Sequence, residues 1–226
     1  MATTDVEALF DSALLGQLES LSLLARRITA GRMRAERRST RHGASAEFAG
    51  FRPFVTGDDW RAIDWNAYAR WRQLVLKLYV EEEDLHVHLL LDSTASMEWG
   101  TPLKFDYARQ VVAGLAYLTL ANLDRAAVVP VGHPATAPWR PSRGRHRFLP
   151  LLRYLATTPV AGKPGTLAAA IRRWTATRPR PGVVVWVSDL FGSDPEDALS
   201  ALDALRHARQ EVAVIQITDP GEAEAG

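Results

Sequence analysis

Cysteine is absent from the 226-residue chain. Its absence excludes disulfide bonds, thiolate zinc sites and cysteine nucleophiles. Long apolar runs are also missing, since no stretch approaches the roughly 20 residues with which a helix crosses a bilayer. The chain begins MATTDVEALF and so carries acids where a signal peptide needs positive charge. We therefore expect a soluble protein of the cytoplasm.

The chain also has almost no net charge and none of the common nucleotide-binding motifs. Its 27 lysine and arginine residues are balanced by 26 acids, which gives a net charge of +1. No overall field therefore draws it to nucleic acid or acidic lipid. Neither GxxxxGK(S/T) nor GxGxxG occurs, which argues against a nucleotide role, and the hydrolase elbow GxSxG is missing as well. With 47% hydrophobic residues, the length suffices for one large domain, or for a domain with an insertion.

Residues 1–43 are predicted to form a helix followed by a basic connection. Apolar residues between positions 5 and 29 recur at helical spacing, which predicts an amphipathic helix. From Arg26 to Arg41 the chain holds seven arginines against a single acid, Glu36. Such a run is usually a solvated connection. Contact with nucleic acid through this stretch is a weaker alternative than docking to a partner or an acidic surface, because no aromatic side chain lies among the arginines to stack on bases.

Two further regions follow, a small strand module at residues 44–84 and a larger domain at residues 85–226. In the module, AEFAGFRPF and LVLKLYVEE predict two strands on either side of the Trp-rich segment TGDDWRAIDWNAYARWR. In the larger domain, apolar strands alternate with helices, which predicts a doubly wound, mostly parallel sheet flanked by helices. The segment PWRPSRGRHR, residues 138–147, is expected to be an exposed loop. The predicted fold class is therefore α/β.

Ligands of an open α/β sheet bind outside the carboxyl ends of its strands. Three segments with oxygen donors are predicted there: DSTAS at residues 92–96, Gly165 with Thr166 at the start of a helix, and Ser188 with Asp189. Oxygen-only donors suit a hard divalent ion such as Mg²⁺ or Mn²⁺ better than zinc or copper. Each aspartate taken alone is better explained as a helix cap. Only the three segments together favour a metal site.

These residues resemble the metal-ion-dependent adhesion site of von Willebrand factor A-like domains. Asp92, Thr94 and Ser96 match its DxSxS element, while Thr166 and Asp189 match its threonine and its second aspartate. More narrowly, the stretch from HGASAEFAGFRPF through GDDWRAIDWNAYAR to LLLDSTASM resembles the bacterial family called domain of unknown function 58. Thr94 departs from the usual serine, since it keeps a hydroxyl group but adds a methyl group.

The resemblance implies a function as well as a fold. One Mg²⁺ or Mn²⁺ ion, held by the five matched residues, would present a vacant position to a carboxylate of a partner protein. The chain would then be a non-enzymatic adaptor or scaffold without a small-molecule substrate. The association of this family with MoxR-type ATPases of the AAA+ class implies such a partner, and a role in the assembly or maturation of other complexes.

A second set of residues belongs to the GDDWRAIDW motif of the family, and two interpretations of it stay open. In one, Arg61 and Arg70 form ion pairs with the motif acids that fix the module against the main domain. In the other, the motif is a partner-binding surface. The tryptophans nearby are either core residues or anchors. The motif residues are Gly57, Asp58, Asp59, Arg61, Asp64, Trp65 and Arg70, and the tryptophans are Trp60, Trp65 and Trp71.

The main enzymatic alternative is a haloacid-dehalogenase-like phosphohydrolase. Asp92, Lys163 and Asp189 would be its nucleophile, its phosphate-binding lysine and its metal-binding acid. That chemistry normally needs a second acid two residues after the nucleophile, and Thr94 at this position cannot shuttle the proton. Two histidines of the segment HVH, residues 86–88, alternate on one strand. Because no third ligand is evident nearby, we expect them to be structural.

Overall fold

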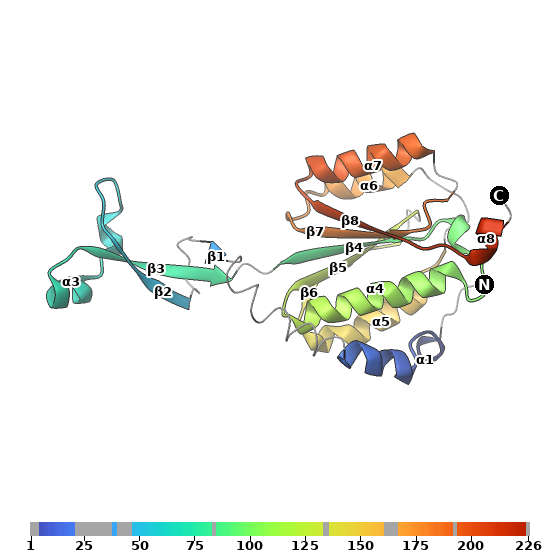
Figure 1. The fold of residues 1–226 in the computed structure, drawn as a ribbon, viewed down its shortest axis with the longest axis horizontal. Coiled ribbons are helices and arrows are strands. Elements are labelled where there is room, and N and C mark those ends of the chain that lie inside the picture. The colour runs from blue at the N-terminus through green and yellow to red at the C-terminus, as the bar shows by residue number, and fades with distance from the viewer. Residues whose placement is uncertain are drawn as a thin grey trace. The chain divides into compact units, whose positions relative to one another are not determined.

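The computed structural model describes residues 5–20, 38–39, 47–82, 85–132, 136–160, 167–191 and 194–224. The chain divides into two compact units (Figure 1). The larger unit comprises residues 1–26 and 84–226, and the smaller unit comprises residues 27–83. Most of the basic stretch from Arg26 to Arg41 lies outside the described residues, which include only positions 38 and 39 of it.

The larger unit is built on a five-stranded sheet. Its strands are β4 (His86–Asp92), β5 (Arg125–Val131), β6 (Trp139–Arg143), β7 (Val183–Ser188) and β8 (Glu211–Gln216). They lie in the order β6-β5-β4-β7-β8 (Figure 1). The pairs β4/β5, β4/β7 and β7/β8 are parallel, and β6 is antiparallel to β5. This order confirms the predicted doubly wound, mostly parallel sheet.

Strand β6 occupies part of the loop predicted at residues 138–147, and that prediction is wrong there. The strand pairs with β5 at the edge of the sheet. An edge strand tolerates Pro141, because the N–H that proline lacks would only be needed in the interior of a sheet. Proline, glycine and arginine in this segment are therefore compatible with an edge strand as well as with a loop.

Helices cover both faces of this sheet (Figure 1). Helices α4 (Lys104–Ala121) and α5 (Phe148–Thr157) lie on one face, and α6 (Leu167–Ala176) and α7 (Pro195–His207) lie on the other. The predicted N-terminal helix is observed as α1 (Val6–Leu9) and the helical residues 12–20. The short helices of this unit are η2 (Ala95–Met97), η3 (Arg145–Arg147) and α8 (Pro220–Glu224).

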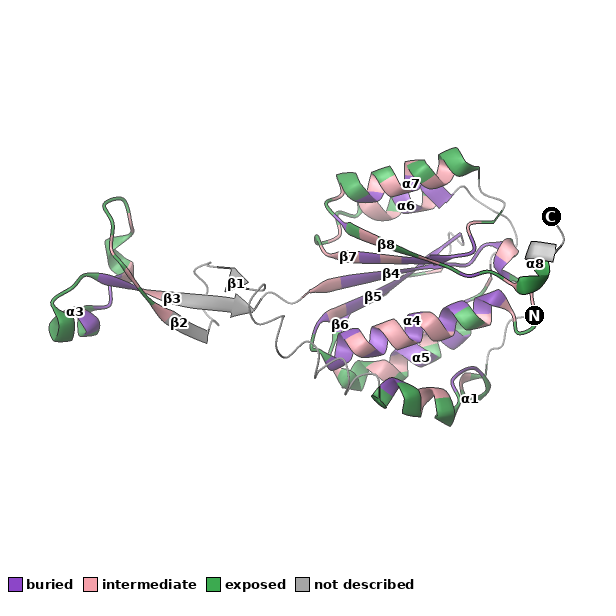
Figure 2. Ribbon diagram, viewed as in Figure 1, coloured by how far each residue is buried: buried purple, intermediate pink, exposed green. Residues whose placement is uncertain are grey.

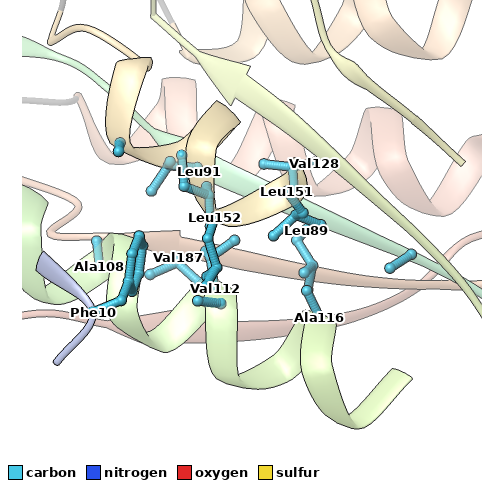
Figure 3. Packing of buried hydrophobic residues seen from close by; sticks show 14 of the residues in the cluster. Phe10, Leu89, Leu91, Ala108, Val112, Ala116, Val128, Leu151, Leu152 and Val187 are labelled. Atoms are coloured by element: carbon cyan, nitrogen blue, oxygen red, sulfur yellow. The ribbon is translucent and has the colours of Figure 1, made fainter. Parts of the chain in front are cut away.

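Side chains of β4 alternate between two hydrophobic clusters, because successive residues of a strand point to opposite faces. Leu89 and Leu91 belong to the cluster that contains residues of α4 and α5 (Figure 3), whereas Leu90 belongs to the cluster with α6 and α7. The first cluster also includes Leu9 and Phe10, so the N-terminal helix packs as part of the larger unit. The central strands are largely buried and the outer faces of the helices are exposed (Figure 2).

The smaller unit is an antiparallel sheet with a helical connection. Strands β1 (Arg38–Ser39), β2 (Glu47–Pro53) and β3 (Val75–Glu82) lie in the order β1-β3-β2. The two longer strands confirm the two that were predicted. Between them, the Trp-rich segment forms η1 (Trp60–Ala62) and α3 (Trp65–Trp71). Among the side chains described in this unit, the buried apolar ones are Ile63, Ala67, Val75 and Leu76.

Candidate metal centre

The parallel pairing of β4 and β7 brings two of the predicted ligand segments together. Leu91 lies opposite Val187, so β4 ends at Asp92 beside the end of β7 at Ser188. The Ser188 hydroxyl donates to Asp92 Oδ2, and the Thr94 amide donates to Asp92 Oδ1 over 2.9 Å. Asp92 is therefore held by both of its oxygens at the carboxyl edge of the sheet.

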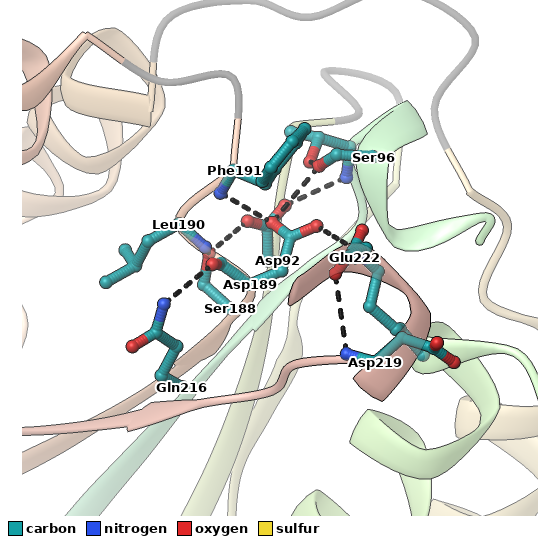
Figure 4. A network of polar contacts seen from close by, with 11 residues as sticks. Asp92, Ser96, Ser188, Asp189, Leu190, Phe191, Gln216, Asp219 and Glu222 are labelled. Carbon is teal, nitrogen blue, oxygen red and sulfur yellow. Dashed lines mark hydrogen bonds and ion pairs between the residues drawn. The ribbon is translucent and has the colours of Figure 1, made fainter. Parts of the chain in front are cut away.

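A chain of hydroxyl groups links the loop after β4 to Asp189 (Figure 4). Thr94 Oγ1 lies 2.9 Å from Ser96 Oγ, and Ser96 Oγ donates to Asp189 Oδ1 over 3.1 Å. The same carboxylate oxygen accepts from the Phe191 N–H over 3.0 Å. The structure thus brings Asp92, Thr94, Ser96 and Asp189 into one hydrogen-bonded cluster.

Thr166, the fifth predicted ligand, lies outside the described residues, as does Gly165. Within the described part of the chain, no group of three or more His, Asp or Glu side chains is placed to hold a metal ion. The cluster instead combines the carboxylates of Asp92 and Asp189 with two hydroxyl groups. Because all of these donors are oxygens, the set fits a hard ion such as Mg²⁺ or Mn²⁺.

The methyl group by which Thr94 differs from serine packs against a glycine. Gly132 follows β5 with a φ of +114°, and a Cβ at this position would lie 3.0 Å from Thr94 Cγ2. The methyl group therefore faces Gly132, while the hydroxyl group faces Ser96. Ser93 holds the same loop on β5, because its N–H and its hydroxyl both donate to the Val131 carbonyl over 2.8 Å. Thr94, which replaces the usual serine, therefore keeps its hydroxyl group inside the cluster.

A buried lysine outside the predicted set joins the cluster. The Lys104 ammonium group donates to Asp189 Oδ2 over 2.7 Å and to Glu222 Oε1 of α8. Burial opposes the charge of Lys104, but the two carboxylate partners outweigh it and raise the pKa of this group. The hydrogen bond from Lys104 in turn lowers the pKa of Glu222. A signal for this contact exists in the sequence, because a lysine in the first turn of a helix opposes the helix dipole and needs anions nearby.

Asp92 and Asp189 differ in how their charge is compensated. Asp92 is 1% exposed, and burial raises the pKa of its carboxyl group, against the effect of the hydrogen bonds that it accepts. A neighbouring cation would favour the ionised form of this group. Asp189 already contacts the ammonium group of Lys104.

Of the four clustered residues only Ser96 is half-buried rather than buried, so it marks the side of the cluster nearest to solvent.

In the smaller unit, two acids of the GDDWRAIDW motif bind basic residues of the neighbouring strands. Asp58 accepts from both terminal guanidinium nitrogens of Arg52, over 2.6 and 2.7 Å. Asp64 caps α3 and forms an ion pair with Lys77 over 3.1 Å. Gly57 has a φ of +111°, a left-handed conformation that glycine adopts without strain. These contacts hold the helical connection on the sheet.

Arg61 and Arg70 take no part in these ion pairs, which differs from the first of the two interpretations left open for the motif. Among the described residues, neither forms an ion pair with a motif acid, since Arg52 and Lys77 are the partners instead. Both partners come from β2 and β3, outside the motif. Asp59 accepts from a backbone N–H of η1 and caps that helix. The tryptophans lie outside the core, at 63%, 57% and 53% exposure for Trp60, Trp65 and Trp71.

His88 of β4 is buried and has contacts typical of a structural histidine. His88 is 3% exposed, and its Nε2 lies 3.1 Å from the Arg180 carbonyl oxygen. Its ring packs against Trp174 with centroids 5.1 Å apart, and burial lowers the pKa of the imidazole. These contacts agree with the structural role that we expect for it.

Residues 50–225 match the family model described as protein of unknown function DUF58. The chain belongs to this family. The match confirms the predicted family, and both the GDDWRAIDW motif and the oxygen cluster fall inside the matched stretch.

Curated relatives of this DUF58 chain include the uncharacterized protein Rv1480 of Mycobacterium tuberculosis and the uncharacterized protein Mb1516 of Mycobacterium bovis. Each is 29% identical over 219 residues, a stretch that covers 95% of this chain and 68% of the relative. The similarity therefore extends through both compact units of the chain.

Two solved structures are similar in part. One is an aerotolerance-related membrane protein from Bacteroides fragilis, with a TM-score of 0.44, 14% identity, and coverage of 60% of this chain and 69% of that protein. The other is a manganese-loaded TRAP protein of Plasmodium vivax, with a TM-score of 0.41, 18% identity, and coverage of 61% and 58%. Among the described helices of this DUF58 chain, none combines the length and the apolar character needed to cross a membrane.

Proposed function

We propose that this DUF58 protein is a non-enzymatic interaction module that binds one Mg²⁺ or Mn²⁺ ion and docks through it onto a carboxylate of a partner protein. The supporting observation is the cluster of Asp92, Thr94, Ser96 and Asp189. It lies at the carboxyl edge of an open α/β sheet, where ligands of such sheets bind. Thr166 completes the proposed ligand set. The ion would supply a positive coordination position that an acidic side chain of the partner fills.

The residues of the cluster have distinct parts in this proposal. Asp92 and Asp189 supply negative charge, and two hydroxyl groups supply neutral oxygens. The Ser188 hydroxyl and the Thr94 amide orient the Asp92 carboxylate. Lys104 competes with a bound ion for Asp189, because its ammonium group already occupies Asp189 Oδ2. The strength of cation binding should therefore depend on Lys104.

The phosphohydrolase alternative receives less support from the geometry. Both oxygens of Asp92 accept hydrogen bonds and its side chain is 1% exposed, which leaves it poorly placed to attack a phosphoryl group. Thr94 occupies the position of the general acid and cannot transfer the proton. Lys163 lies outside the described residues. We therefore propose no catalytic step.

The family resemblance suggests a MoxR-type AAA+ ATPase as the partner, in the assembly or maturation of other complexes. Docking of this kind should need the divalent ion and should be lost in EDTA. A contact between nucleic acid and the stretch from Arg26 to Arg41 would behave in the opposite way, because it would weaken steeply with salt and ignore EDTA.

Isothermal titration calorimetry with Mg²⁺ and Mn²⁺ on metal-stripped protein tests the proposal. We expect saturable binding at one site in the wild type, and loss of that binding in Asp92→Ala, Ser96→Ala and Asp189→Ala at matched folded content. Asp203→Ala is the matched control, because Asp203 is exposed on α7 and outside the cluster. An absence of binding heat, together with a melting temperature unchanged by millimolar metal, would contradict the proposal.

A further inference from the structure

Strand β8 lies at one edge of the five-stranded sheet, and its outer side carries backbone groups without partners. On the inner side, the Glu211 N–H donates to the Gly182 carbonyl over 2.9 Å, in parallel register with β7. Because the backbone groups of successive strand residues point to opposite sides, the N–H and C=O groups of Val212, Val214 and Gln216 face outwards. Within the described part of the chain, no group bonds to them there.

An apolar strip accompanies this open edge. Val214 lies directly beside Trp186 of β7, on the face of the sheet that α6 and α7 cover. Trp186 is 1% exposed, whereas Val214 is 40% exposed. The hydrophobic cluster of this face therefore ends at the edge with an uncovered side chain. Leu199 of α7 is more exposed still, at 61%.

Leu199 lies on the side of α7 that faces away from α6. Asp197 and Ser200 hold the other side, because they accept hydrogen bonds from α6 over 3.2 and 2.9 Å. Helix α7 packs on β8 and α6 packs on β5, so the side of α7 away from α6 borders the open edge (Figure 1). At roughly 3.6 residues per turn, Leu199, Leu202 and Arg206 share this side.

The charges of α7 are complementary to those of a second α7 that runs in the opposite direction. Its first turn carries Glu196 and Asp197, and its last turn carries Arg206 and His207. Asp197 is bound to α6, whereas Glu196 and Arg206 are exposed and form no ion pair with a described residue. Two antiparallel copies of α7 would bring the acidic start of each helix beside the basic end of the other.

A two-fold axis through Val214 pairs the strand edge with itself. Outward-facing residues lie opposite outward-facing residues in an antiparallel pair, so Val212 meets Gln216 of the second copy and Val214 meets its own equivalent. Every outward N–H and C=O group of these three residues then has a partner. Glu211 lies opposite Ile217 in this register, so no acid faces another acid across the strands.

The same axis brings the two copies of α7 into the register that their charges favour. Val214 lies about 10 Å into β8, and α7, which a short turn joins to the start of β8, runs back about 10 Å over its last seven residues or so. The axis therefore passes near residue 200, between Leu199 and Leu202. Arg206 then lies level with Glu196 of the second copy, and Asp203 lies level with an apolar stretch that includes Leu199.

We infer that two copies of this chain form a symmetric dimer through the outer edge of β8 and the adjoining side of α7. An interface of this symmetry needs a surface that is complementary to itself, and the edge, the apolar strip and the ends of α7 all meet that condition. A strand of another protein would satisfy the backbone groups, but only a second copy necessarily supplies the matching ends of α7. The contact goes beyond the proposed docking through a metal ion, because none of its residues belongs to the oxygen cluster.

Sedimentation velocity of the full chain in EDTA tests the inference. At micromolar concentration the wild type is expected to sediment as a dimer, with twice the chain mass of 25.0 kDa. Val214→Pro should sediment as a monomer, because it removes an outward N–H and keeps the hydrogen bonds to β7. The matched control is Val214→Thr, which keeps the N–H and should remain a dimer.

A charge exchange on α7 tests the register. Arg206→Glu should raise the dissociation constant of the dimer by about tenfold or more, because it places like charges level with one another. Combining it with Glu196→Arg should restore the dimer, since each helix then offers the opposite pair. Thermal melting followed by circular dichroism establishes that all variants are folded.

A monomeric wild type at high micromolar concentration would overturn the inference. If its Val212 and Gln216 amides were also protected from hydrogen exchange, another segment of the same chain would cover the edge. A dimer that persists in Val214→Pro would place the interface elsewhere, and failure of the charge exchange to restore the dimer would contradict the antiparallel contact of α7. Because EDTA removes divalent ions, these outcomes are independent of the metal centre.

Discussion

Trp186 in the larger unit is 1% exposed, whereas Trp65 in the smaller unit is 57% exposed. The arginines differ in the same way, since Arg109 is fully buried and Arg70 is exposed. Arg109 has its acceptors inside the fold, because it donates to two carbonyl groups at the end of α5. A buried cation needs internal acceptors, while an exposed cation keeps its hydrogen-bonding capacity for a partner.

The carboxylates of the two units differ at one position, Asp92. In the smaller unit, Asp58 and Asp64 are bound to basic side chains and to backbone amides, so their role is structural. In the larger unit, Asp92 is bound to a hydroxyl group and an amide, and Asp189 shares its charge with one lysine. Among the described residues, Asp92 is therefore the one of these four acids that forms no ion pair.

The sharpest contrast should come from tryptophan. We expect Trp186→Ala to lower the free energy of unfolding by about 4 kcal/mol, because it removes a fully buried side chain and leaves a cavity. Trp65→Ala should change the same quantity by less than about 0.5 kcal/mol, as is usual for an exposed residue. Urea denaturation followed by circular dichroism measures both. Similar losses in the two variants would break the comparison.

Arginine should give a somewhat smaller contrast. Arg109→Met removes hydrogen bonds of 3.1 and 3.0 Å to the Leu155 and Ala156 carbonyl groups, and it removes the ion pair with Asp106. We expect a loss of about 3 kcal/mol from removing these hydrogen bonds and breaking this partly buried pair, and a change below about 0.5 kcal/mol for the matched variant Arg70→Met. The midpoints of urea denaturation of the two variants measure both changes. An unaffected Arg109→Met would mean that these acceptors contribute nothing to stability.

Lys104→Met sharpens the comparison at the metal centre. The change leaves Asp189 and Glu222 without their cation, and in EDTA we expect a loss of about 2 kcal/mol of unfolding free energy. Mn²⁺ should then raise the melting temperature of this variant more than that of the wild type, because no ammonium group competes for Asp189. Glu222→Gln is the control that leaves Lys104 on Asp189. An equal Mn²⁺ effect in Lys104→Met and the wild type would exclude competition by Lys104.

The smallest expected effect is a stabilisation. Burial raises the pKa of Asp92, which means that the fold disfavours its ionised form. Asp92→Asn removes that charge at nearly constant shape, so in EDTA the unfolding free energy should rise by about 1 kcal/mol. Differential scanning calorimetry at neutral pH measures the change. If Asp92→Asn were instead less stable than the wild type, the ionised carboxylate would stabilise the fold, as expected of a carboxylate that only caps a helix.

Much of the fold could be predicted because local patterns determine it. The apolar runs of β4 and β7 and the helical periodicity of α4 predict a parallel sheet with helices on both faces, and that sheet is observed. Parallel strands finish at one edge of a sheet, which predicts that the polar residues ending β4 and β7 lie close together, and the structure places Asp92 and Asp189 in one cluster there. Such inferences need no knowledge of which side chains meet across the fold.

Two of the contacts that the sequence does not predict, those of Lys104 and Arg109, join distant parts of the chain. Lys104 meets Glu222 only because α8 follows β8 to the same edge of the sheet. Arg52 lies only six residues before Asp58 but outside the GDDWRAIDW motif, so the interpretation that pairs the motif acids with Arg61 and Arg70 does not include it. Arg109 looks like an exposed helix residue in the sequence, and its burial depends on α5, which begins at Phe148. Pairing across such separations is set by tertiary packing rather than by local periodicity.

The most direct test of the metal-dependent docking proposal is anomalous diffraction from crystals of the metal-stripped protein soaked in Mn²⁺. The proposal predicts a single strong anomalous peak among the side-chain oxygens of Asp92, Thr94, Ser96 and Asp189, with the Lys104 ammonium group moved away from Asp189. No peak in this cluster at millimolar Mn²⁺, with the Lys104 hydrogen bond to Asp189 intact, would contradict it and leave these residues a structural polar network.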